Sequence, residues 1–363
     1  MARWPEIDWT VQPYGADGAN LVASCSPGPL LYSHLDTSLD GAPADAAITG
    51  RGDPVGPLVV DGDRVEGFGL GVARGPAAAA LLGFVSARRG QLLLAGSGTH
   101  RRGGDAEGVR AYLASAASAA SAASAASAPS AAIVAKGGPP SVLWEEPGAA
   151  YVQVRVDGRY GAALAPGSAV PVGGVATHAG VLLAALSAWR SDYLRSRRPV
   201  GQVGQVGPEA GVGALRAGSP GKPDLLPASL VADLYVVTVP DEDLAGLREE
   251  IEASLRTDLA ATALGAAAVS VVVEPVHPAA ATPAGAPIVV AAREAWTDEF
   301  GAAPEPVTGW TGSTDGVVFR AHGIDTVRLG PAATRSADDP RRDILQLDQL
   351  AAFSRVYAAL LSS

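Results

Sequence analysis

The sequence predicts an α/β protein in which a second domain is inserted into the first. Short apolar segments typical of buried strands alternate with helical segments over the first 147 residues and again after residue 280. The segments in between have the order β-α-β-β-α-β, which is that of a ferredoxin-like α+β unit. We therefore expect one discontinuous α/β domain, residues 1–147 and 280–363, and an inserted α+β domain, residues 148–279.

The composition supports two cores and a small-molecule role. The chain has 363 residues, 48% of them hydrophobic, and a mean hydropathy of +0.19. Its net charge of −10 and pI of about 5.0 argue against a general attraction to nucleic acid or to an anionic membrane. We see no export signal and no uncharged apolar run near the ~18 residues of a membrane span. We expect neither nucleic acid nor membrane as a partner.

Cysteine and lysine are both rare in this chain. Cys25 is the only cysteine, which excludes an intrachain disulfide and a thiolate metal cluster and fits a reducing cytoplasm. We therefore expect a cytoplasmic protein. Lys136 and Lys222 are the only lysines, and alanine and glycine are abundant, as coding bias in a GC-rich bacterial genome would produce.

The first half of the discontinuous domain is expected to begin with a helix or arm that packs on it, within residues 1–28. Apolar runs, turn residues and helix-start signals define the next elements of this half. These elements are a strand at 30–34, a hairpin at 58–65, a glycine-rich loop at 67–76 entering a helix to about 87, a strand at 91–95, a helix from about 105 into a Ser-Ala-Ala repeat at 115–130, and a strand at 131–135.

The same signals predict the elements of the remaining chain. For the inserted domain we expect strands at 151–156, 203–215, 229–239 and 269–273 and helices at 175–194 and 241–264. The chain then returns to the first domain with a helix at 288–300, a strand at 326–329 and a helix at 345–361.

The strand at residues 30–34 ends in a chemically active pair. His34 is its last residue, and Asp36 lies two positions later. Because ligands of open α/β sheets bind at the carboxyl ends of strands, we expect both side chains in a crevice. A carboxylate that holds one imidazole nitrogen makes the other more basic, so this pair can act as an oriented base. The alternative is a purely structural hydrogen bond at a strand end.

Five segments in this order resemble the zinc-dependent aminoacylase and carboxypeptidase family, which includes acetylornithine deacetylase, succinyl-diaminopimelate desuccinylase and glutamate carboxypeptidase. They are residues 33–37 (SHLDT), 61–75, the inserted β-α-β-β-α-β unit, 312–316 (GSTDG) and 323–331 (GIDTVRLGP). The resemblance covers nearly the whole chain. It implies a three-layer domain of the zinc-exopeptidase type, with the inserted domain serving as a lid that forms homodimers.

The family's chemistry is a two-zinc site in which carboxylates and histidines hold the metals and a glutamate activates water. By this resemblance His34 matches the first zinc-binding histidine, and Asp36 matches the aspartate that orients it. The other positions differ. Val72 stands where the bridging aspartate belongs, His100 and Arg101 where the paired glutamates belong, Lys136 where a further carboxylate belongs, and Asp338 where the last histidine belongs. We therefore expect no metal ligands and no zinc.

The replacements have a common direction, because they remove negative charge and add cations. We expect the crevice to bind a small anionic, amino-acid-like ligand directly, through Arg74, Arg101 and Lys136, with His34, Asp36 and His100 as catalytic candidates. Asp315 lies in a turn that borders the family's substrate pocket, and its alternative role is a helix cap. Asp338 is a further ligand-binding candidate whose alternative is a surface loop.

Three functional interpretations remain open on this basis. The first is a diverged, metal-independent enzyme that acts on an amino-acid derivative by amide, acyl or acid–base chemistry. The second is a catalytically inactive homologue that binds a ligand or a partner protein. The third is a residual amidohydrolase with a single zinc on His34, Asp36 and Asp338. For all three the resemblance implies a homodimer formed through the lid.

Overall fold

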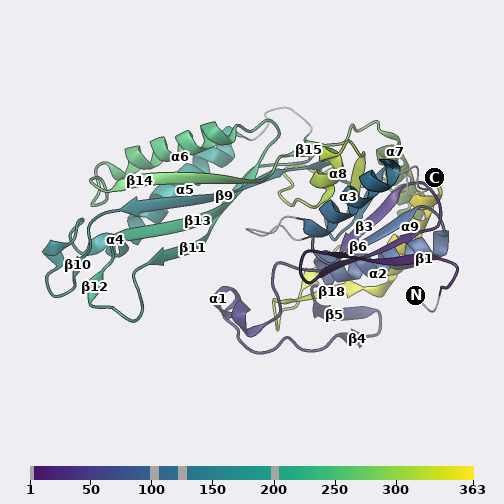
Figure 1. Ribbon diagram of the computed structural model, residues 1–363, viewed down its shortest axis with the longest axis horizontal. Helices are drawn as coiled ribbons and strands as arrows, with labels where there is room; N and C mark the ends of the chain where they lie inside the picture. Colours follow the sequence, from purple (N-terminus) through teal and green to yellow (C-terminus); the bar gives the residue numbers. More distant parts are fainter. Residues whose placement is uncertain (1–3, 99–105, 122–128, 198–203) are drawn as a thin grey trace. The chain divides into compact units, whose positions relative to one another are not determined.

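The computed structural model describes residues 4–98, 106–121, 129–197 and 204–363 and divides the chain into two compact units (Figure 1). Unit 1 comprises Met1–Glu146, Ala280–Val307 and Ser313–Ser363. Unit 2 comprises Pro147–Ala279 and Thr308–Gly312. The predicted fold class, an α/β domain with an inserted α+β domain, is confirmed.

The main sheet of unit 1 has six strands in the order β1-β2-β6-β3-β7-β16. They are β1 (Asp8–Tyr14), β2 (Gly18–Ser24), β6 (Gln91–Ala95), β3 (Leu30–His34), β7 (Ala132–Ala135) and β16 (Thr326–Leu329). The last four run parallel to one another, whereas β1 and β2 form an antiparallel hairpin at one side. The carboxyl ends of the four parallel strands therefore meet at one edge of the sheet.

The helix or arm expected within residues 1–28 is wrong, because residues 8–24 form the β1–β2 hairpin. The turn between the strands contains Gly15, whose φ of +55° favours glycine. Along β1, Trp9, Gln12 and Tyr14 are partly buried and the other residues are exposed, so burial does not alternate strictly with hydrophobicity. Polar residues and a proline interrupt this strand, so a search for apolar runs does not find it.

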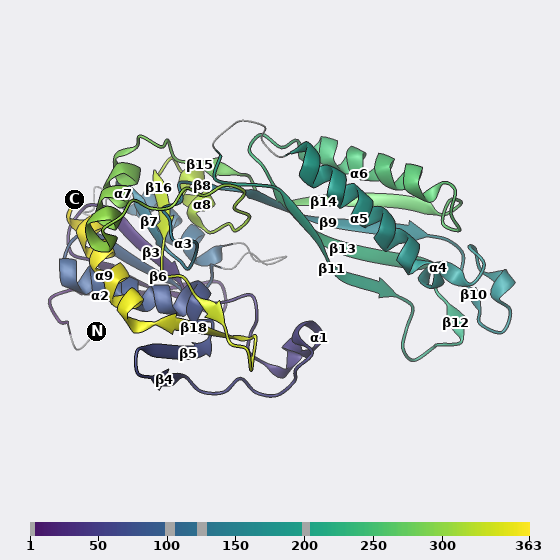
Figure 2. The ribbon, with the colours of Figure 1, turned by 180° about the vertical axis from the view of Figure 1, so that it is seen from behind.

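Helices cover both faces of the main sheet and complete three layers (Figures 1 and 2). One face packs against α2 (Gly75–Ala87), α7 (Pro287–Phe300) and α9 (Leu347–Ser362), and the other against α3 (Glu107–Ser121) and α8 (Gly316–Ala321). Alternation along β3 explains this division, since Leu31 belongs to the first core and Leu30 and Tyr32 to the second. Each leucine buried in this way stabilises the fold by about 1.5–3 kcal/mol.

A second, four-stranded sheet of unit 1 has the order β17-β18-β5-β4. Its strands are β17 (Thr334–Arg335), β18 (Arg342–Gln346), β5 (Arg64–Phe68) and β4 (Val59–Asp61). The hairpin predicted at residues 58–65 is confirmed, with Asp61 paired to Arg64 around Gly62. The glycine-rich loop forms a short π-helical turn, η2 (Leu70–Arg74), before α2 begins.

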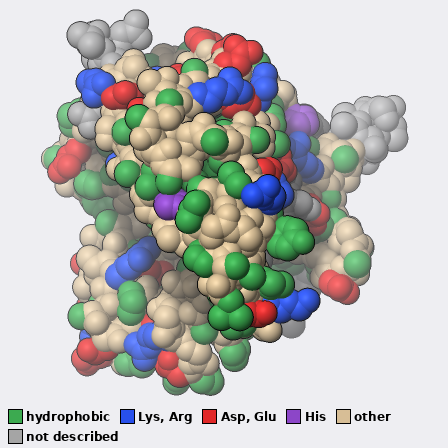
Figure 3. All heavy atoms as spheres, turned by 90° about the vertical axis from the view of Figure 1, so that its left-hand side faces the viewer, with side chains coloured by type: hydrophobic (Ala, Val, Ile, Leu, Met, Phe, Trp, Pro, Cys, Tyr) green, Lys and Arg blue, Asp and Glu red, His purple; other side chains and the backbone are tan. Residues whose placement is uncertain are grey.

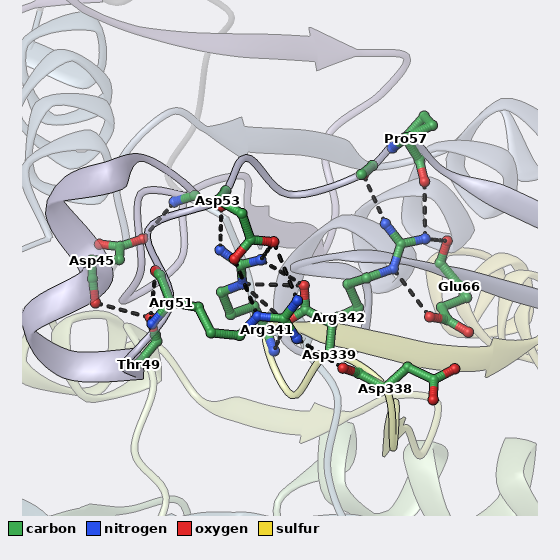
Figure 4. Close-up of polar contacts among 12 residues, drawn as sticks. Asp45, Thr49, Arg51, Asp53, Pro57, Glu66, Asp338, Asp339, Arg341 and Arg342 are labelled. Carbon is green, nitrogen blue, oxygen red and sulfur yellow. Dashed lines mark hydrogen bonds and ion pairs between the residues drawn. The ribbon is translucent and has the colours of Figure 1, made fainter.

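Two buried arginines fasten the long loop before β4 (Figure 4). Arg341 donates to the carbonyl of Asp53 at 2.6 Å and pairs with the Asp339 carboxylate at 2.7 Å. Arg342 donates to the carbonyl of Gly56 at 2.7 Å and pairs with Glu66 at 3.1 Å. This arginine clamp, Arg341 and Arg342, holds a loop that contains η1 (Pro43–Asp45) and α1 (Ala46–Thr49).

Unit 2 is a four-stranded antiparallel sheet in the order β11-β13-β9-β14 with two helices on one face. Its main elements are, in chain order, β9 (Gly148–Asp157), α5 (Ala179–Ser196), β11 (Glu209–Ala217), β13 (Ser229–Thr238), α6 (Leu244–Leu259) and β14 (Ala268–His277). This is the ferredoxin-like order. Smaller elements are β10 (Gly161–Ala162), η3 (Pro166–Ser168) and β12 (Leu225–Leu226).

The single helix expected at residues 175–194 is wrong in one respect, because it is broken at His178. A short helix, α4 (Gly174–Thr177), precedes α5, and the φ of −102° at His178 interrupts the helical path. The imidazole Nε2 of His178 lies 3.0 Å from the carbonyl oxygen of Val172, which stabilises the break.

The point where the chain leaves unit 1 lies next to the point where it returns. The short strands β8 (Glu145–Glu146) and β15 (Ala280–Ala281) pair with each other in antiparallel register.

Residues 122–128 of the Ser-Ala-Ala repeat lie outside the described residues, and α3 reaches Ser121. The segment Leu70–Ala87 is apolar and long enough to cross a membrane, but half of it is buried, as expected for a core helix.

Candidate functional site

Four strand ends form the floor of the candidate site. The last residues of β3, β6, β7 and β16 are His34, Ala95, Ala135 and Leu329, and each strand pairs in parallel with its neighbour. A hydrogen bond of 2.8 Å from the Ser33 hydroxyl to the carbonyl of Ala135 fastens β3 to β7 at this edge. The side chains just beyond these ends are therefore brought together by the sheet itself.

His34 and Asp36 form a hydrogen-bonded pair at the end of β3. The Nδ1 atom of His34 lies 3.0 Å from the Asp36 carboxylate and 3.0 Å from the Asp36 carbonyl oxygen. These two acceptors assign the proton to Nδ1 and leave a lone pair on Nε2. His34 is 1% exposed, and its Nε2 has no hydrogen-bond partner among the described residues. The pair thus presents a buried, oriented and unengaged base.

Tyr32 and Asp315 join this pair on the same face of β3. Tyr32 precedes His34 by two residues, and its hydroxyl donates a hydrogen bond to the Asp315 carboxylate. Burial first, and then the charge of Asp315, raise the pKa of Tyr32. The Asp315 side chain does not cap α8, whereas the Thr314 hydroxyl accepts a hydrogen bond from the Gly316 amide at 3.0 Å. The capping alternative is therefore wrong for Asp315 and holds for Thr314.

Gly98 fits the space between these groups. Its amide donates to the Asp36 carboxylate at 2.9 Å. A Cβ atom at this position would lie 2.5 Å from the Cβ of His34 and 2.6 Å from the Tyr32 hydroxyl, and it would collide with the Asp315 carboxylate. Only glycine lets the backbone approach the pair so closely.

Lys136 comes directly after β7 and is partly buried. Within the described residues its ammonium group has no hydrogen bond or ion pair. Burial first, and then the positive charge of Arg328, lower the pKa of Lys136 to about 8, although Asp315, Glu146 and Asp36 act in the opposite direction. The side chain of Lys136 therefore changes between its charged and neutral forms just above neutral pH.

A buried charged network that the sequence pattern did not reveal lies under Lys136. Arg328 donates to the carbonyl of Gly137 at 2.5 Å, and its own pKa is lowered to about 10 by burial. Glu146 pairs with Arg320 at 2.6 Å and accepts a hydrogen bond from Thr314. One signal was present in the sequence, namely an arginine in the middle of the apolar strand at 326–329.

Arg74 lies beside the loop after β3. Its Nε donates to the carbonyl of Leu35 at 3.4 Å, its Nη1 donates to the carbonyl of Phe68 at 3.1 Å, and its guanidinium stacks 5.0 Å from the centre of the Phe68 ring. The side chain is solvent-accessible. Arg74 is thus oriented by backbone contacts near the His34–Asp36 pair and keeps its positive charge there.

Asp338 is not brought to this edge of the sheet. Asp338 is exposed, and its carbonyl accepts a hydrogen bond from Arg51 at 2.8 Å, beside the arginine clamp (Figure 4). Its surface-loop alternative is therefore correct. His100 and Arg101 lie outside the described residues.

The side chains that the structure describes at this edge do not fit a two-zinc centre. In the described part of the chain, no three His, Cys, Asp or Glu side chains gather in a way that could hold a metal ion. The single-zinc set of His34, Asp36 and Asp338 is therefore wrong. Val72, at the position of the bridging carboxylate, is 47% exposed and offers no ligand, and Lys136 adds a cation where a ligand would stand.

Comparison with known proteins shows structural likeness without sequence likeness. No family model matches the sequence, and no curated protein matches it. Human carnosine dipeptidase 1 has a TM-score of 0.69 at 12% identity, over 100% of this chain and 87% of that chain. A dipeptidase from Saccharomyces cerevisiae has a TM-score of 0.63 at 14% identity, over 98% and 86%.

A third similar solved structure is described as a member of the M20 family. It is an M20 family metallo-carboxypeptidase from Sulfolobus solfataricus, with a TM-score of 0.63 at 13% identity, over 98% of this chain and 90% of that chain. The structural likeness therefore covers nearly all of this chain, whereas sequence identity is low. The chain has the fold of the M20 family metallopeptidases, a peptidase-like hydrolase fold.

Proposed function

We propose that this protein is a metal-independent enzyme on the peptidase-like fold, acting on a small anionic, amino-acid-derived molecule. The observation that carries the proposal is the buried His34 Nε2, which is oriented through Asp36 and lacks a partner in the described chain, with a lysine at the neighbouring strand end. A zinc site would require carboxylates where Val72 and Lys136 stand.

The charges at this edge favour an anionic ligand. Asp36 is occupied by His34 and by the Gly98 amide, and Asp315 accepts from Tyr32. Lys136 and Arg74 remain as cations that can meet a ligand carboxylate. At an effective dielectric constant of ~20, a carboxylate ~4 Å from one cation gains about 4 kcal/mol before desolvation. A planar guanidinium can also bind both carboxylate oxygens.

The His34–Asp36 pair supplies the acid–base chemistry. His34 Nε2 would accept a proton from water or from the substrate, and Asp36 would hold the Nδ1 proton and stabilise the resulting imidazolium. The negative charge that develops on the substrate would be stabilised by Lys136 in its ammonium form. These two roles can serve amide, acyl or proton-transfer reactions of an amino-acid derivative.

Calorimetry of the chelator-treated protein tests the binding part of this proposal. We expect N-acyl amino acids or dicarboxylates to bind without added zinc, and Lys136→Met to weaken the binding at least about tenfold at pH 7. Lys222→Met, which removes the exposed lysine of unit 2, is the matched control and should bind as the wild type does. Binding that appears only after zinc is added, or no binding at all, would reject the proposal.

A catalytically inactive, ligand-binding homologue is the second candidate. The observation that favours it is the loss of acidic residues at the positions of Val72 and Lys136. Turnover separates the two candidates. If ligands bind but the wild type forms no more product from them than His34→Gln does, the protein has the binding role.

The assembly and location of the protein belong to this proposal as well. We propose a cytoplasmic homodimer formed through unit 2. Edge strand β11 exposes Val212 and Leu215, at 41% and 40%, and loops beside β10 expose Tyr160 and Leu164. Apolar side chains are interspersed with charged ones on the face drawn in Figure 3. Light scattering of the purified protein would show a monomer if this part is wrong.

A further inference from the structure

We propose that Lys136 is a nucleophile whose side-chain amine forms a reversible imine with the ketone carbonyl of a 2-oxo carboxylate. The inference rests on the anionic-ligand site proposed above and assigns to it a substrate class and a covalent step. It is carried by the position of Lys136 beside the His34–Asp36 pair.

The sheet directs Lys136 and His34 to the same face. Tyr32 pairs with Val134 across β3 and β7, and both side chains belong to the core under α3 and α8. His34 and Lys136 each lie two residues later, so alternation along the strands brings both side chains to that face. The backbone of Lys136 continues the sheet, because its amide donates to the carbonyl of Leu329 at 3.4 Å.

The amine of Lys136 is available for reaction. Among the described side chains none forms a hydrogen bond or ion pair with it. The charged groups that act on it are Arg328 on β16, Asp315 before α8, Glu146 on β8 and Asp36 after β3. Burial and Arg328 together shift the pKa of Lys136 from 10.5 to about 8. Desolvation and an adjacent cation are the two conditions that activate lysine nucleophiles.

Atoms and electrons balance without a further reactant. The lone pair of Nζ attacks the ketone carbon, a C–N bond forms, and the carbonyl π electrons move to oxygen, which takes a proton from solvent. His34 Nε2 accepts a proton from the nitrogen and returns it to the hydroxyl group. Water then leaves as the C–O bond breaks, and the nitrogen lone pair completes the C=N bond. The product of the whole sequence is therefore the protonated imine. The reverse sequence releases the ligand.

A 2-oxo carboxylate fits this site because its ketone and its carboxylate need different partners. An attacking amine is neutral and cannot balance the ligand's negative charge. Arg74, held near the end of β3 by the carbonyls of Leu35 and Phe68, offers a planar guanidinium that can bind both carboxylate oxygens. The ligand is thus a small molecule with a carboxylate next to a ketone.

Reductive trapping tests the inference. The protein is incubated at pH 8 with pyruvate and cyanoborohydride, and the reduced adduct is located by peptide mass spectrometry. Lys136 and Lys222 are the only lysines, so the wild type contains its own reference. We expect Lys136 to be modified at least about tenfold faster than the exposed Lys222, because more of its amine is unprotonated at this pH.

Lys136→Arg is the matched variant, since it keeps the positive charge but cannot form an imine. We expect it to bind pyruvate in calorimetry and to form no adduct at position 136, while Lys222→Arg is trapped like the wild type. If the wild type binds pyruvate but modifies Lys136 no faster than Lys222, the imine is disproved and the anionic site remains. If neither pyruvate nor the acyl amino acids bind, both proposals fail.

Discussion

Glu146 and Arg320 form a buried ion pair, with Oε2 and Nη1 2.6 Å apart and side chains 0% and 4% exposed. The other two guanidinium nitrogens of Arg320 also donate, to the Thr282 hydroxyl at 3.1 Å and the Thr326 carbonyl at 2.8 Å. All these residues belong to unit 1 and lie next to the candidate site. Such a pair tolerates the loss of neither partner, because the other would stay buried and unpaired.

Arg320→Met should therefore destabilise unit 1 by about 3–5 kcal/mol, as measured by urea unfolding. The exposed pair of Arg355 and Glu299 is the matched control, with side chains 61% and 20% exposed. Arg355→Met should change the free energy of unfolding by less than about 1 kcal/mol. Equal effects of the two substitutions would contradict the structure.

Gly98→Ala should disturb the His34–Asp36 pair. The added methyl group would collide with Asp315, Tyr32 and His34, and we expect a loss of about 1–3 kcal/mol in unfolding free energy together with weaker ligand binding. Gly180, within α5, has no atom within 4 Å of its ideal Cβ. Gly180→Ala should instead stabilise the protein by about 0.5–1 kcal/mol. Unchanged stability and binding in Gly98→Ala would show that the crowding is absent.

Lys136 should make stability depend on pH above neutrality. Its pKa is about 8 in the folded chain and 10.5 ordinarily, so the unfolded chain binds more protons between these values. The free energy of unfolding contributed by this residue should therefore rise from pH 8 to pH 10.5. Lys136→Met should be more stable than the wild type by about 1–2 kcal/mol at pH 7, after a discount for partial exposure, and the gain should disappear near pH 10.5. A gain that persists at pH 10.5 would contradict this assignment.

Asp339 should make stability depend on pH in acid. Its hydrogen bonds with Arg341 lower its pKa to about 2 from 3.8, so its contribution to stability is complete above pH 3.8 and is lost as the pH falls through 2. Asp339→Asn should be less stable than the wild type at pH 6, and the difference should shrink towards pH 2. Asp258→Asn, an exposed position on α6, is the control in the same denaturation series. A constant difference from pH 6 to pH 2 would refute the pairing.

The fold could be predicted from the sequence because apolar runs mark the buried strands directly. Strands β6 and β16 were predicted to the residue, and the order of elements in unit 2 was predicted correctly. The β1–β2 hairpin was missed since its strands are half exposed and carry polar residues. A local sequence pattern reflects burial, and a strand at the edge of a sheet is buried too little to have a clear apolar pattern.

The candidate site was less predictable, because its contacts join residues far apart in the chain. His34 and Asp36 are neighbours in sequence and were found. The hydrogen bond from Tyr32 to Asp315 spans 283 positions, and no local pattern indicates it. Arg328 was missed as well, although a charged residue within an apolar strand is a local signal of a buried partner.

The pairing of β8 with β15 gives the insertion of unit 2 a consequence for folding. Glu146 and Ala280 are opposite each other in this two-stranded ribbon, so the ends of the long excursion are a strand spacing apart, about 5 Å. While unit 2 is unfolded, pairing these two ends costs the conformational entropy of closing a very long loop. Once unit 2 has folded, its rigid body acts as a short tether between them. Unit 2 should therefore act as a local cross-link that accelerates the folding of unit 1.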